Sequence, residues 1–480
     1  MRDKIIDLEL QASALEPNSE ERQVFRDRVV AYTERFIDTI EENKAFNYTE
    51  DQGAGLYSSP ISEEPISIDD ALTLFEEHVE KPGLNPASGG HLAYVPGGGI
   101  YHASLGDYIA AITNRYAGVF YPSPGAVRMT NMLIRWMADL VEYPDSAAGN
   151  LCSGGSIANL TAIVTARDAK GIKGADYHRC VIYTTSQTHH SIDKAINIAG
   201  MSEAHRTYVE VDESYQMVSA ALEKQITEDK ENGLIPWLVV GSAGTTDVGA
   251  IDPLKEIGQI AKKNNLWFHI DGAYGGFFSL TRKGKELLNG MQLSDSIVMD
   301  PHKGLFLPYG LGVLLVKERK HLQYTHRYSA AYFQDVVEAE DELSPADISP
   351  ELTKHFRALR LWMPLKLCGT KPFRACLEEK LLLAQYFHDK MAEMAGFEVG
   401  QVPKLSVATF RYVPESGDAN AFNKKLLQKI LEDGRIFLSS TDLEGRFTLR
   451  LAVLSFRSHL RTIDLALEII AAKTAEILNS

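Results

Sequence analysis

The chain has 480 residues, of which 45% are hydrophobic and 24% charged, an ordinary balance for a protein that can bury a large core in more than one domain. Its 64 acidic and 49 basic residues give a formal net charge of −15, which argues against nucleic acid or an anionic membrane as a partner. The charged start is unlike a signal peptide and no apolar run approaches a membrane span, so a cytoplasmic location is expected.

The first hundred residues are predicted to form two helices that lack a core of their own. One helix, over 19–43, has Ser19 as its cap and an apolar stripe at helical spacing, and the second covers 68–80. The segments 44–66 and 82–99 are rich in glycine and proline, which is typical of loops. We therefore expect this region to pack against another surface, such as a second subunit.

Between residues 104 and 320, helical patterns alternate with short apolar runs. This alternation predicts a mainly parallel α/β sheet joined by crossover helices. Ligands of such sheets bind beyond the carboxyl ends of the strands, so residues that follow a strand are the first candidates for a site. The predicted helices cover 104–115, 125–142, 156–170, 189–199, 213–230 and 253–264, and the predicted strands cover 180–183, 207–210, 237–241, 266–270, 296–299 and 312–316.

The remainder of the chain is predicted to be a smaller α+β domain that follows an acidic segment. Residues 335–347 have the composition of a solvated surface loop, although a mobile lid over a site has the same composition. The predicted elements after it are a long helix over 350–394, strands near 397–399, 406–412 and 447–454, and a terminal helix over 462–477.

The tetrapeptide Asp300-Pro301-His302-Lys303 places a lysine directly after a predicted strand. A sheet edge can aim its amine into a pocket, whereas an exposed surface lysine is the ordinary alternative. Asp271 ends another predicted strand, where a turn cap is the ordinary alternative. Together they match the needs of pyridoxal phosphate (PLP), because the lysine forms the Schiff base and the acid keeps the pyridine nitrogen protonated.

A turn of small residues supplies a candidate phosphate site. Gly154, Gly155 and Ser156 stand at the start of the predicted helix 156–170. Backbone amides can approach a phosphate there, and the helix N-terminus adds positive potential. Such a turn by itself is more often a plain helix cap, but the presence of a candidate PLP lysine favours phosphate binding.

A histidine pair follows the predicted strand 180–183. His189 or His190 can lie over a flat ring and contact a substrate carboxylate, although polar surface is the commoner role of such a pair. No third ligand accompanies them, and the four cysteines lack the spacing of a metal or redox motif, so no metal site is predicted.

Two threonines follow the predicted strand 237–241. Thr245 and Thr246 face the same rim, and Thr246 is expected near Asp271. The ordinary alternative is a plain strand-to-helix turn in which Asp252 caps the helix that follows.

The chain resembles the group II PLP-dependent decarboxylases, the family of aromatic-L-amino-acid, tyrosine, glutamate and diaminobutyrate decarboxylases, which have PLP fold type I. The resemblance spans about residues 89–461 and rests on an ordered set of short motifs. These are Gly-His-Leu-Ala-Tyr at 90–94, Ser-Pro at 123–124, Ser-Gly-Gly-Ser at 153–156, Gln-Thr-His at 187–189, His-Ile-Asp-Gly-Ala at 269–273, Asp-Pro-His-Lys at 300–303, His-Phe-Arg-Ala-Leu at 355–359, Leu-Arg at 449–450 and Phe-Arg at 456–457.

The resemblance implies a role for each matching residue. Lys303 carries the Schiff base, Asp271 pairs with the pyridine nitrogen, and His189 stacks on the ring with Ala273 against its other face. Asp300 stands where some members have asparagine, and a carboxylate there repels phosphate unless it is turned away or paired. The phosphate end is held by Gly154, Gly155, Ser156 and His302.

The resemblance also implies an architecture. It consists of an N-terminal helical segment over residues 1–95 that wraps around a partner, a large PLP-binding domain over 96–350 with a mainly parallel seven-stranded sheet, and a small α+β domain over 351–480. Members of the family are homodimers, which agrees with the missing N-terminal core.

Two departures from the family pattern stand out. Many relatives carry two glutamates after the Ser-Pro pair, whereas residues 125–130 here contain no acid. The family also places a tyrosine on a loop before the His-Phe-Arg motif, where it helps return a proton to the substrate carbon. The matching stretch 343–347 has no tyrosine, and Tyr332 is the nearest candidate.

The expected reaction is α-decarboxylation of an L-amino acid to an amine and carbon dioxide. An aromatic entrance segment, 94–101 with Phe120 and Tyr121, suits a bulky or aromatic side chain. Apart from Arg128, no arginine is clearly placed for a side-chain carboxylate. The alternatives are an aldehyde synthase on the same scaffold, another PLP-dependent carbon–carbon lyase or aminotransferase, and a non-catalytic PLP-fold binding protein.

Overall fold

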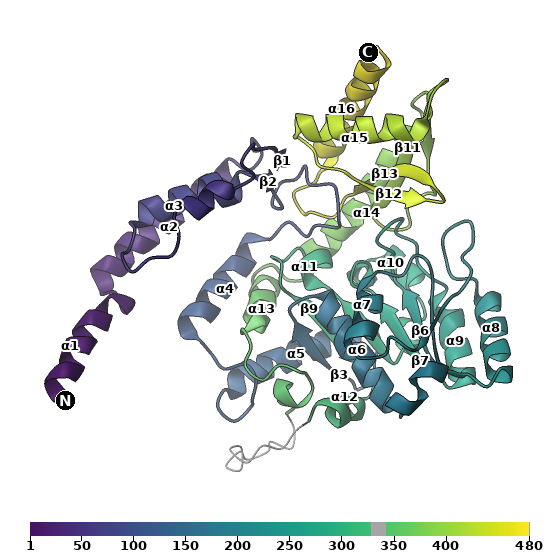
Figure 1. The fold of residues 1–480 in the computed structure, drawn as a ribbon, viewed down its shortest axis with the longest axis horizontal. Coiled ribbons are helices and arrows are strands. Elements are labelled where there is room, and N and C mark those ends of the chain that lie inside the picture. The colour runs from purple at the N-terminus through teal and green to yellow at the C-terminus, as the bar shows by residue number, and fades with distance from the viewer. Residues whose placement is uncertain (328–341, 480) are drawn as a thin grey trace.

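The computed structural model describes residues 1–327 and 342–479. They form a body of two parts with an N-terminal arm that extends away from it (Figure 1). The larger part is built on a seven-stranded sheet and the smaller part on a four-stranded sheet.

The large sheet has the strand order β3-β9-β8-β7-β6-β4-β5. Strand β9 runs antiparallel to both of its neighbours and the other pairings are parallel, which confirms the predicted mainly parallel seven-stranded sheet. Its strands are β3 (Ala148–Cys152), β4 (Cys180–Thr184), β5 (His205–Tyr208), β6 (Ile235–Ser242), β7 (Trp267–Asp271), β8 (Ser296–Met299) and β9 (Gly312–Val316).

Strand β3 was not expected from the sequence. It is an edge strand that begins Ala-Gly-Asn, which gives a weak strand pattern. Its pairing with β9, where Cys152 lies opposite Gly312, fixes it in the sheet. The pairing matters for the site because β3 leads directly into the glycine turn at 154–155.

Helices cover both faces of this sheet and bury the alternating side chains of each strand. One face packs against α5 (Pro124–Leu140), α8 (Ser219–Glu231) and α9 (Leu254–Asn264). The opposite face packs against α6 (Gly155–Ala169), α7 (Ser191–Ile198) and α12 (Arg319–His326). Of these helices only α12 had no predicted counterpart.

Several predicted helix boundaries are wrong for local reasons. The helix expected over 213–230 begins only at Ser219, because Asp212 accepts backbone N–H groups of Ser214 and Gln216 and so forms a turn. Asp252 does not cap α9. Its carboxylate instead accepts the backbone N–H groups of Met217 and Ser242 at 2.8 and 2.7 Å.

The long helix expected over 350–394 is two helices, α13 (Arg357–Cys368) and α14 (Lys371–Ala392). Gly369, with φ of 68°, breaks the helical pattern between them. Helix α13 packs against α4 (Tyr101–Thr113) and α5 beside the large sheet, whereas α14 continues to the small sheet. The division at residue 350 stays a prediction, as does the one at residue 95.

The small sheet is antiparallel, with the order β10-β11-β13-β12. Its strands are β10 (Phe397–Val399), β11 (Val407–Tyr412), β12 (Ser439–Leu443) and β13 (Arg446–Ala452). One face is apolar and packs against α14, α15 (Ala419–Asp433) and α16 (Leu460–Leu478). The predicted α+β class is confirmed, although α15 and β12 were missed.

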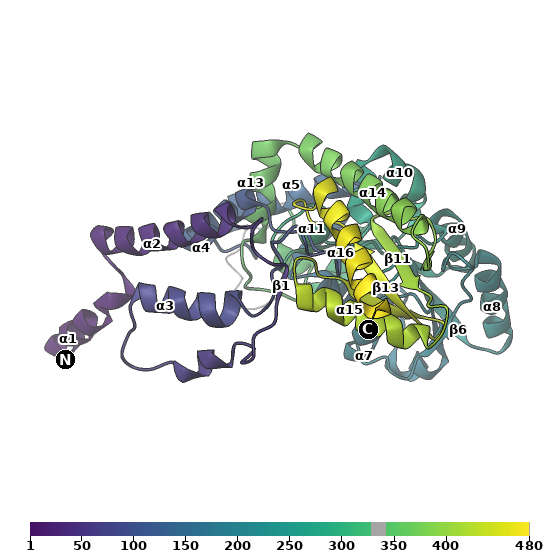
Figure 2. The same cartoon turned by 90° about the horizontal axis from the view of Figure 1, so that it is seen from above.

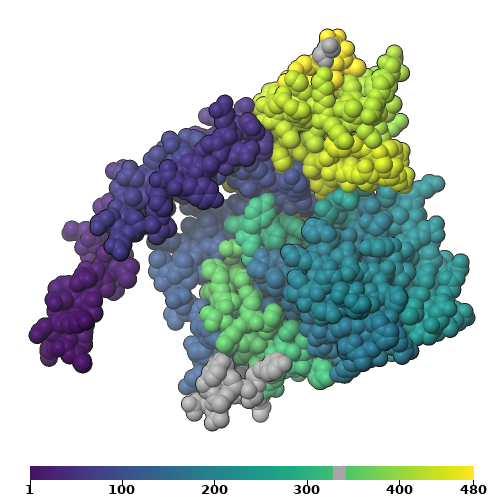
Figure 3. Space-filling model, in the orientation of Figure 1, coloured from purple at the N-terminus to yellow at the C-terminus, as the bar shows by residue number. Residues whose placement is uncertain are grey.

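The N-terminal arm consists of α1 (Arg2–Ala12), α2 (Ser19–Asp38) and α3 (Ile68–Phe75), which a π-helical turn extends to Glu80. Figures 2 and 3 show that it projects from the body, and none of the three helices has a buried residue. Asn18, not Ser19, caps α2, because its side chain accepts the N–H groups of Glu20 and Glu21.

In the described part of the chain, no helix combines the length and the apolar character that a membrane crossing needs.

The buried imidazole of His91 predicts acid sensitivity of the fold. His91 is fully buried, and burial lowers its pKa to about 4 against the opposing effect of the Pro86 carbonyl. Between pH 6.5 and about 4 the unfolded chain binds a proton that the folded chain does not. As the pH is lowered through this window, the free energy of unfolding therefore decreases, and this group contributes about 1.4 kcal/mol per pH unit to the decrease.

Urea denaturation between pH 7.5 and 5 measures this effect. The variant His91→Leu should have a shallower pH dependence than the parent, and the exposed-site control His178→Leu should keep the parental slope. Equal slopes for all three proteins would contradict a neutral buried His91.

Candidate active site

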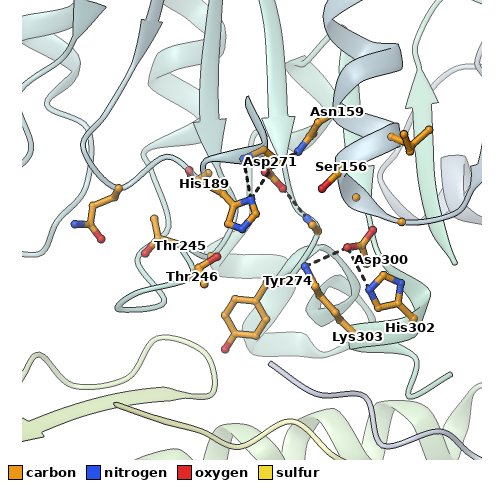
Figure 4. A pocket seen from close by; sticks show the side chains of 18 of the residues that line it. Ser156, Asn159, His189, Thr245, Thr246, Asp271, Tyr274, Asp300, His302 and Lys303 are labelled. Atoms are coloured by element: carbon orange, nitrogen blue, oxygen red, sulfur yellow. Dashed lines mark hydrogen bonds and ion pairs between the residues drawn. The ribbon is translucent and has the colours of Figure 1, made fainter. Parts of the chain in front are cut away.

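All nine residues predicted to bind the cofactor line one cavity of about 340 Å³ (Figure 4). They are Gly154, Gly155, Ser156, His189, Thr246, Asp271, Ala273, His302 and Lys303. Tyr332, the predicted loop tyrosine, lies outside the described residues.

The topology of the sheet explains why these residues meet. Asp271 is the last residue of β7, Lys303 follows β8, and His189 follows β4. These strands run in the same direction, so their carboxyl ends lie at one edge of the sheet. The glycine turn after β3 and Thr246 after β6 reach the same edge.

At the start of α6, the backbone of the glycine turn lies very close to Asp300 and to Gly312. A Cβ added to Gly155 would lie 2.7 Å from Oδ2 of Asp300, and one added to Gly312 would lie 2.5 Å from the carbonyl carbon of Gly154. Backbone alone fits here, and it faces the cavity at the N-terminus of a 15-residue helix. Small residues at a helix N-terminus fit a phosphate group.

Asp300 is buried and paired with the lysine that follows it. Its Oδ2 lies 3.1 Å from Nζ of Lys303 and 3.7 Å from Nε2 of His302. Lys303 therefore gives the carboxylate a cationic partner, which reduces the expected repulsion of a phosphate. Nδ1 of His302 donates to the Leu311 carbonyl at 2.6 Å, and burial lowers the pKa of this imidazole.

Asp271 is almost completely buried and is held by two donors. The backbone N–H of Ala273 donates to Oδ1 at 3.1 Å, and Nδ2 of Asn159 donates to Oδ2 at 3.0 Å. These bonds orient the carboxylate at the cavity wall, where it can face a protonated ring nitrogen. The site thus offers the two groups that PLP needs, an anchoring amine and an acid.

His189 is held beside this acid as a neutral imidazole. Its Nδ1 lies 2.8 Å from Oγ of Ser191 and accepts the Ser191 backbone N–H at 3.2 Å. Burial is the largest cause of the lowered pKa of His189, and the negative charge of Asp271 acts against it. His189 is the member of the pair that lines the cavity, and the ring of His190 lies 4.1 Å from it between centroids.

The sequence interpretation missed several residues of the cavity wall, among them Asn159, Gln187, Ser191 and Tyr274. Helical spacing could have found Asn159, since it lies three positions after Ser156 on α6. Tyr274 could not have been found this way. Its hydroxyl bonds to Oγ of Ser406 at 2.8 Å and so joins the cavity to the residue before β11 of the small sheet.

Comparison with known proteins agrees with this geometry. Residues 65–413 match the pyridoxal-dependent decarboxylase conserved domain. The chain therefore belongs to this family and is a PLP-dependent amino-acid decarboxylase, a lyase. The predicted family, fold class and cofactor are confirmed.

Individual relatives refine the comparison. An aromatic-L-amino-acid decarboxylase of Bacillus atrophaeus is 34% identical over 386 residues, 79% of this chain and 78% of that protein. A phenylacetaldehyde synthase of Arabidopsis thaliana is 28% identical over 75% of this chain and 76% of its own length. The crystal structure of Oryza sativa TDC with PLP and tryptamine superposes with a TM-score of 0.90 at 25% identity, covering 96% of this chain and 99% of that one.

The glycine turn predicts that one methyl group will weaken cofactor binding. Gly155→Ala should raise the PLP dissociation constant by about tenfold, because the new Cβ overlaps the buried Asp300 carboxylate and overpacking of this kind costs about 1–3 kcal/mol. Fluorescence titration of the apoenzyme with PLP measures it.

Gly174→Ala is the matched control, because a Cβ there meets nothing within 4 Å. It should leave the PLP dissociation constant unchanged. An unaltered dissociation constant for Gly155→Ala would show that the turn does not contact the phosphate end.

Proposed function

We propose that the enzyme removes the α-carboxylate of an aromatic L-amino acid and releases the amine and carbon dioxide. The observation that carries this proposal is the convergence of Lys303, Asp271, His189 and the glycine turn on one cavity. The similarity to an aromatic-L-amino-acid decarboxylase supports the substrate class.

In this proposal Lys303 holds the cofactor covalently through Nζ, and Asp271 faces the ring nitrogen and keeps it protonated. Bound PLP supplies an electron sink for the electron pair that the departing carboxylate leaves behind. Asp300 stabilises the amine of Lys303, because its carboxylate lies 3.1 Å from Nζ and is the counter-ion whenever this amine is free and protonated.

His189 and Ala273 hold the cofactor ring between them. A neutral imidazole suits this place, because a flat uncharged ring can pack on an aromatic face and still offer one N–H to a substrate carboxylate. Gly154, Gly155, Ser156 and His302 hold the phosphate end, and Thr246 supports the ring beside Asp271. We keep Tyr332 as the proposed donor of the proton that replaces the carboxylate.

An aromatic segment beside the lysine supports a bulky substrate. Gly97 lies against the carbonyl of His302, and the backbone N–H of Ile100 donates to the Phe306 carbonyl at 2.8 Å. The segment 94–101 thus runs along the residues that follow Lys303, and it contributes the exposed rings of Tyr94 and Tyr101.

Arg128, the candidate partner for an acidic substrate side chain, already has partners within the protein. Its Nη1 lies 2.8 Å from Oε1 of Glu342, and its guanidinium lies 5.2 Å from the centre of the Phe120 ring. This pairing favours an aromatic substrate over glutamate.

An aldehyde synthase is the second candidate. The similarity to a phenylacetaldehyde synthase and the absence of tyrosine from residues 342–356 both favour it. In that reaction the product is an aldehyde, with ammonia and hydrogen peroxide released and oxygen consumed.

Product analysis on an amino-acid panel separates the candidates. With L-tryptophan, L-tyrosine and L-phenylalanine we expect carbon dioxide and the matching amine in equal amounts, and at least about tenfold lower kcat/KM with L-glutamate and L-2,4-diaminobutyrate. Lys303→Ala should release neither product. Peroxide and ammonia equal to carbon dioxide would establish the aldehyde synthase instead, and turnover confined to L-glutamate would refute the aromatic class.

We further propose that the protein is a homodimer whose N-terminal arm packs on the partner subunit. The arm supports this because Val24, Phe25, Val29 and Val30 of α2 are 57, 46, 42 and 48% exposed on a helix that projects from the body (Figure 3). Apolar side chains gathered on a projecting helix are typical of an interface.

Light scattering coupled to size-exclusion chromatography tests the dimer. The parent should have twice the chain mass of 53.2 kDa. Val29→Asp should weaken the dimer by at least about tenfold, since it places a charge in an apolar contact, whereas Gln23→Asp on the same exposed helix should not. A parent protein with the mass of one chain would contradict the proposal.

A cytoplasmic location remains part of the proposal. The four cysteines are all free thiols, as is usual for proteins of a reducing compartment. Detection of the protein in a membrane or secreted fraction of its source would contradict it.

A further inference from the structure

We propose that Asn159 is a positioning residue which orients the cofactor acid Asp271 and the ring-covering His189 together, and that the buried His269 fixes the direction of its amide. The inference deepens the proposed function and rests on the role of Asp271 given there. Asn159 lies on α6, is 1% exposed, and bonds to groups of two other elements, strand β7 and the first residue of α7.

The amide of Asn159 is fully used. Nδ2 donates to Oδ2 of Asp271 at 3.0 Å and to Oγ of Ser191 at 2.9 Å, and Oδ1 lies 3.0 Å from Nε2 of His269. A carboxylate can only accept hydrogen bonds, so the nitrogen must be the end that faces Asp271. A reversed amide would place two oxygens against each other in a buried site.

His269, which lies outside the cavity wall, fixes the amide of Asn159 in this direction. It is fully buried and does not line the cavity. Burial lowers its pKa to about 4, so the ring is neutral near pH 7 and carries a single N–H.

The proton of His269 can be located from its neighbours. Nε1 of Trp267 can only donate, and it donates to Oγ of Ser296 at 2.9 Å. The Ser296 hydroxyl can then donate to Nδ1 of His269 at 2.8 Å, which leaves the ring proton on Nε2, directed at Oδ1 of Asn159. The chain of donors therefore runs from Trp267 through Ser296, His269 and Asn159 to Asp271.

A second branch leads to the other catalytic side chain. Oγ of Ser191 accepts from Asn159 and so points its own hydrogen at Nδ1 of His189, 2.8 Å away. With Nδ1 of His189 accepting, its ring proton lies on Nε2. One amide thus sets the acceptor geometry of Asp271 and the hydroxyl direction beside His189.

The test measures PLP affinity of the apoenzyme, which does not depend on the identity of the substrate. Asn159→Leu removes both donors at similar volume, and it should raise the PLP dissociation constant about 10- to 100-fold, as expected for loss of a hydrogen bond to a charged group. Thr165→Val is the matched control, because Thr165 is a buried polar residue of the same helix whose hydroxyl bonds to the Thr161 carbonyl. It should leave the dissociation constant unchanged.

Two His269 variants separate positioning from packing. His269→Leu should raise the PLP dissociation constant by about tenfold although the residue does not reach the cavity, and His269→Gln, which keeps a donor, should stay within about threefold of the parent. Because the effect of His269 passes through Asn159, the double variant Asn159→Leu/His269→Leu should bind PLP no more weakly than Asn159→Leu alone.

A spectroscopic measurement accompanies the affinities. The visible absorbance of the PLP-loaded protein should respond to pH differently in Asn159→Leu and in the parent, whereas Thr165→Val should match the parent. Asn159→Asp, which is isosteric, serves if the leucine variant does not fold, and it should also bind PLP at least about tenfold more weakly through repulsion of Asp271. Thermal unfolding checks that each variant is folded.

The inference is overturned if a folded Asn159→Leu binds PLP within about threefold of the parent, or if the two leucine substitutions weaken binding additively. The PLP dissociation constants could change as expected while the enzyme turns over none of the aromatic amino acids. That result would refute the substrate class and leave the positioning role of Asn159 in place.

Discussion

A carboxylate buried at the end of a central strand is the constraint on which the active site depends. A buried carboxylate is costly unless donors surround it, and the structure supplies Asp271 with the backbone N–H of Ala273 and the amide of Asn159. The second donor requires α6 to lie across the strand end, which in turn requires β3 at the sheet edge. The placement of the acid and the glycine turn that precedes α6 are therefore one arrangement.

The same arrangement explains how an aspartate can stand beside a phosphate site. Asp300 lies against the glycine turn, and Oδ2 of its carboxylate pairs with Lys303. A Cβ at Gly155 or Gly312 would collide with this carboxylate or with the turn itself. The positions of the glycines, Asp300 and Lys303 thus depend on one another, and a substitution at one of them should displace the others.

Much of the fold could be predicted because the signals were local. Apolar runs such as 237–241 and 296–299 became β6 and β8, and the helical patterns between them became crossover helices. The failures had both nonlocal and local causes. Strand β3 is held by its pairing with β9, the turn before α8 by the Asp212 carboxylate, and the end of α13 by a glycine with positive φ. The site residues at strand ends were predictable and helical spacing could have found Asn159, whereas Tyr274 acts through a contact with a distant segment.

The sequence by itself determined the residue types and the order of the strand ends, and hence the cofactor chemistry, because a lysine and an acid after parallel strands must meet at one edge of the sheet. Only the tertiary structure decided the protonation and orientation of the groups around them. The pairing of Asp300 with Lys303, the neutral state of His189 and the direction of the Asn159 amide depend on burial and on partners far apart in the chain. Desolvation and hydrogen-bond geometry exist only after the chain has folded.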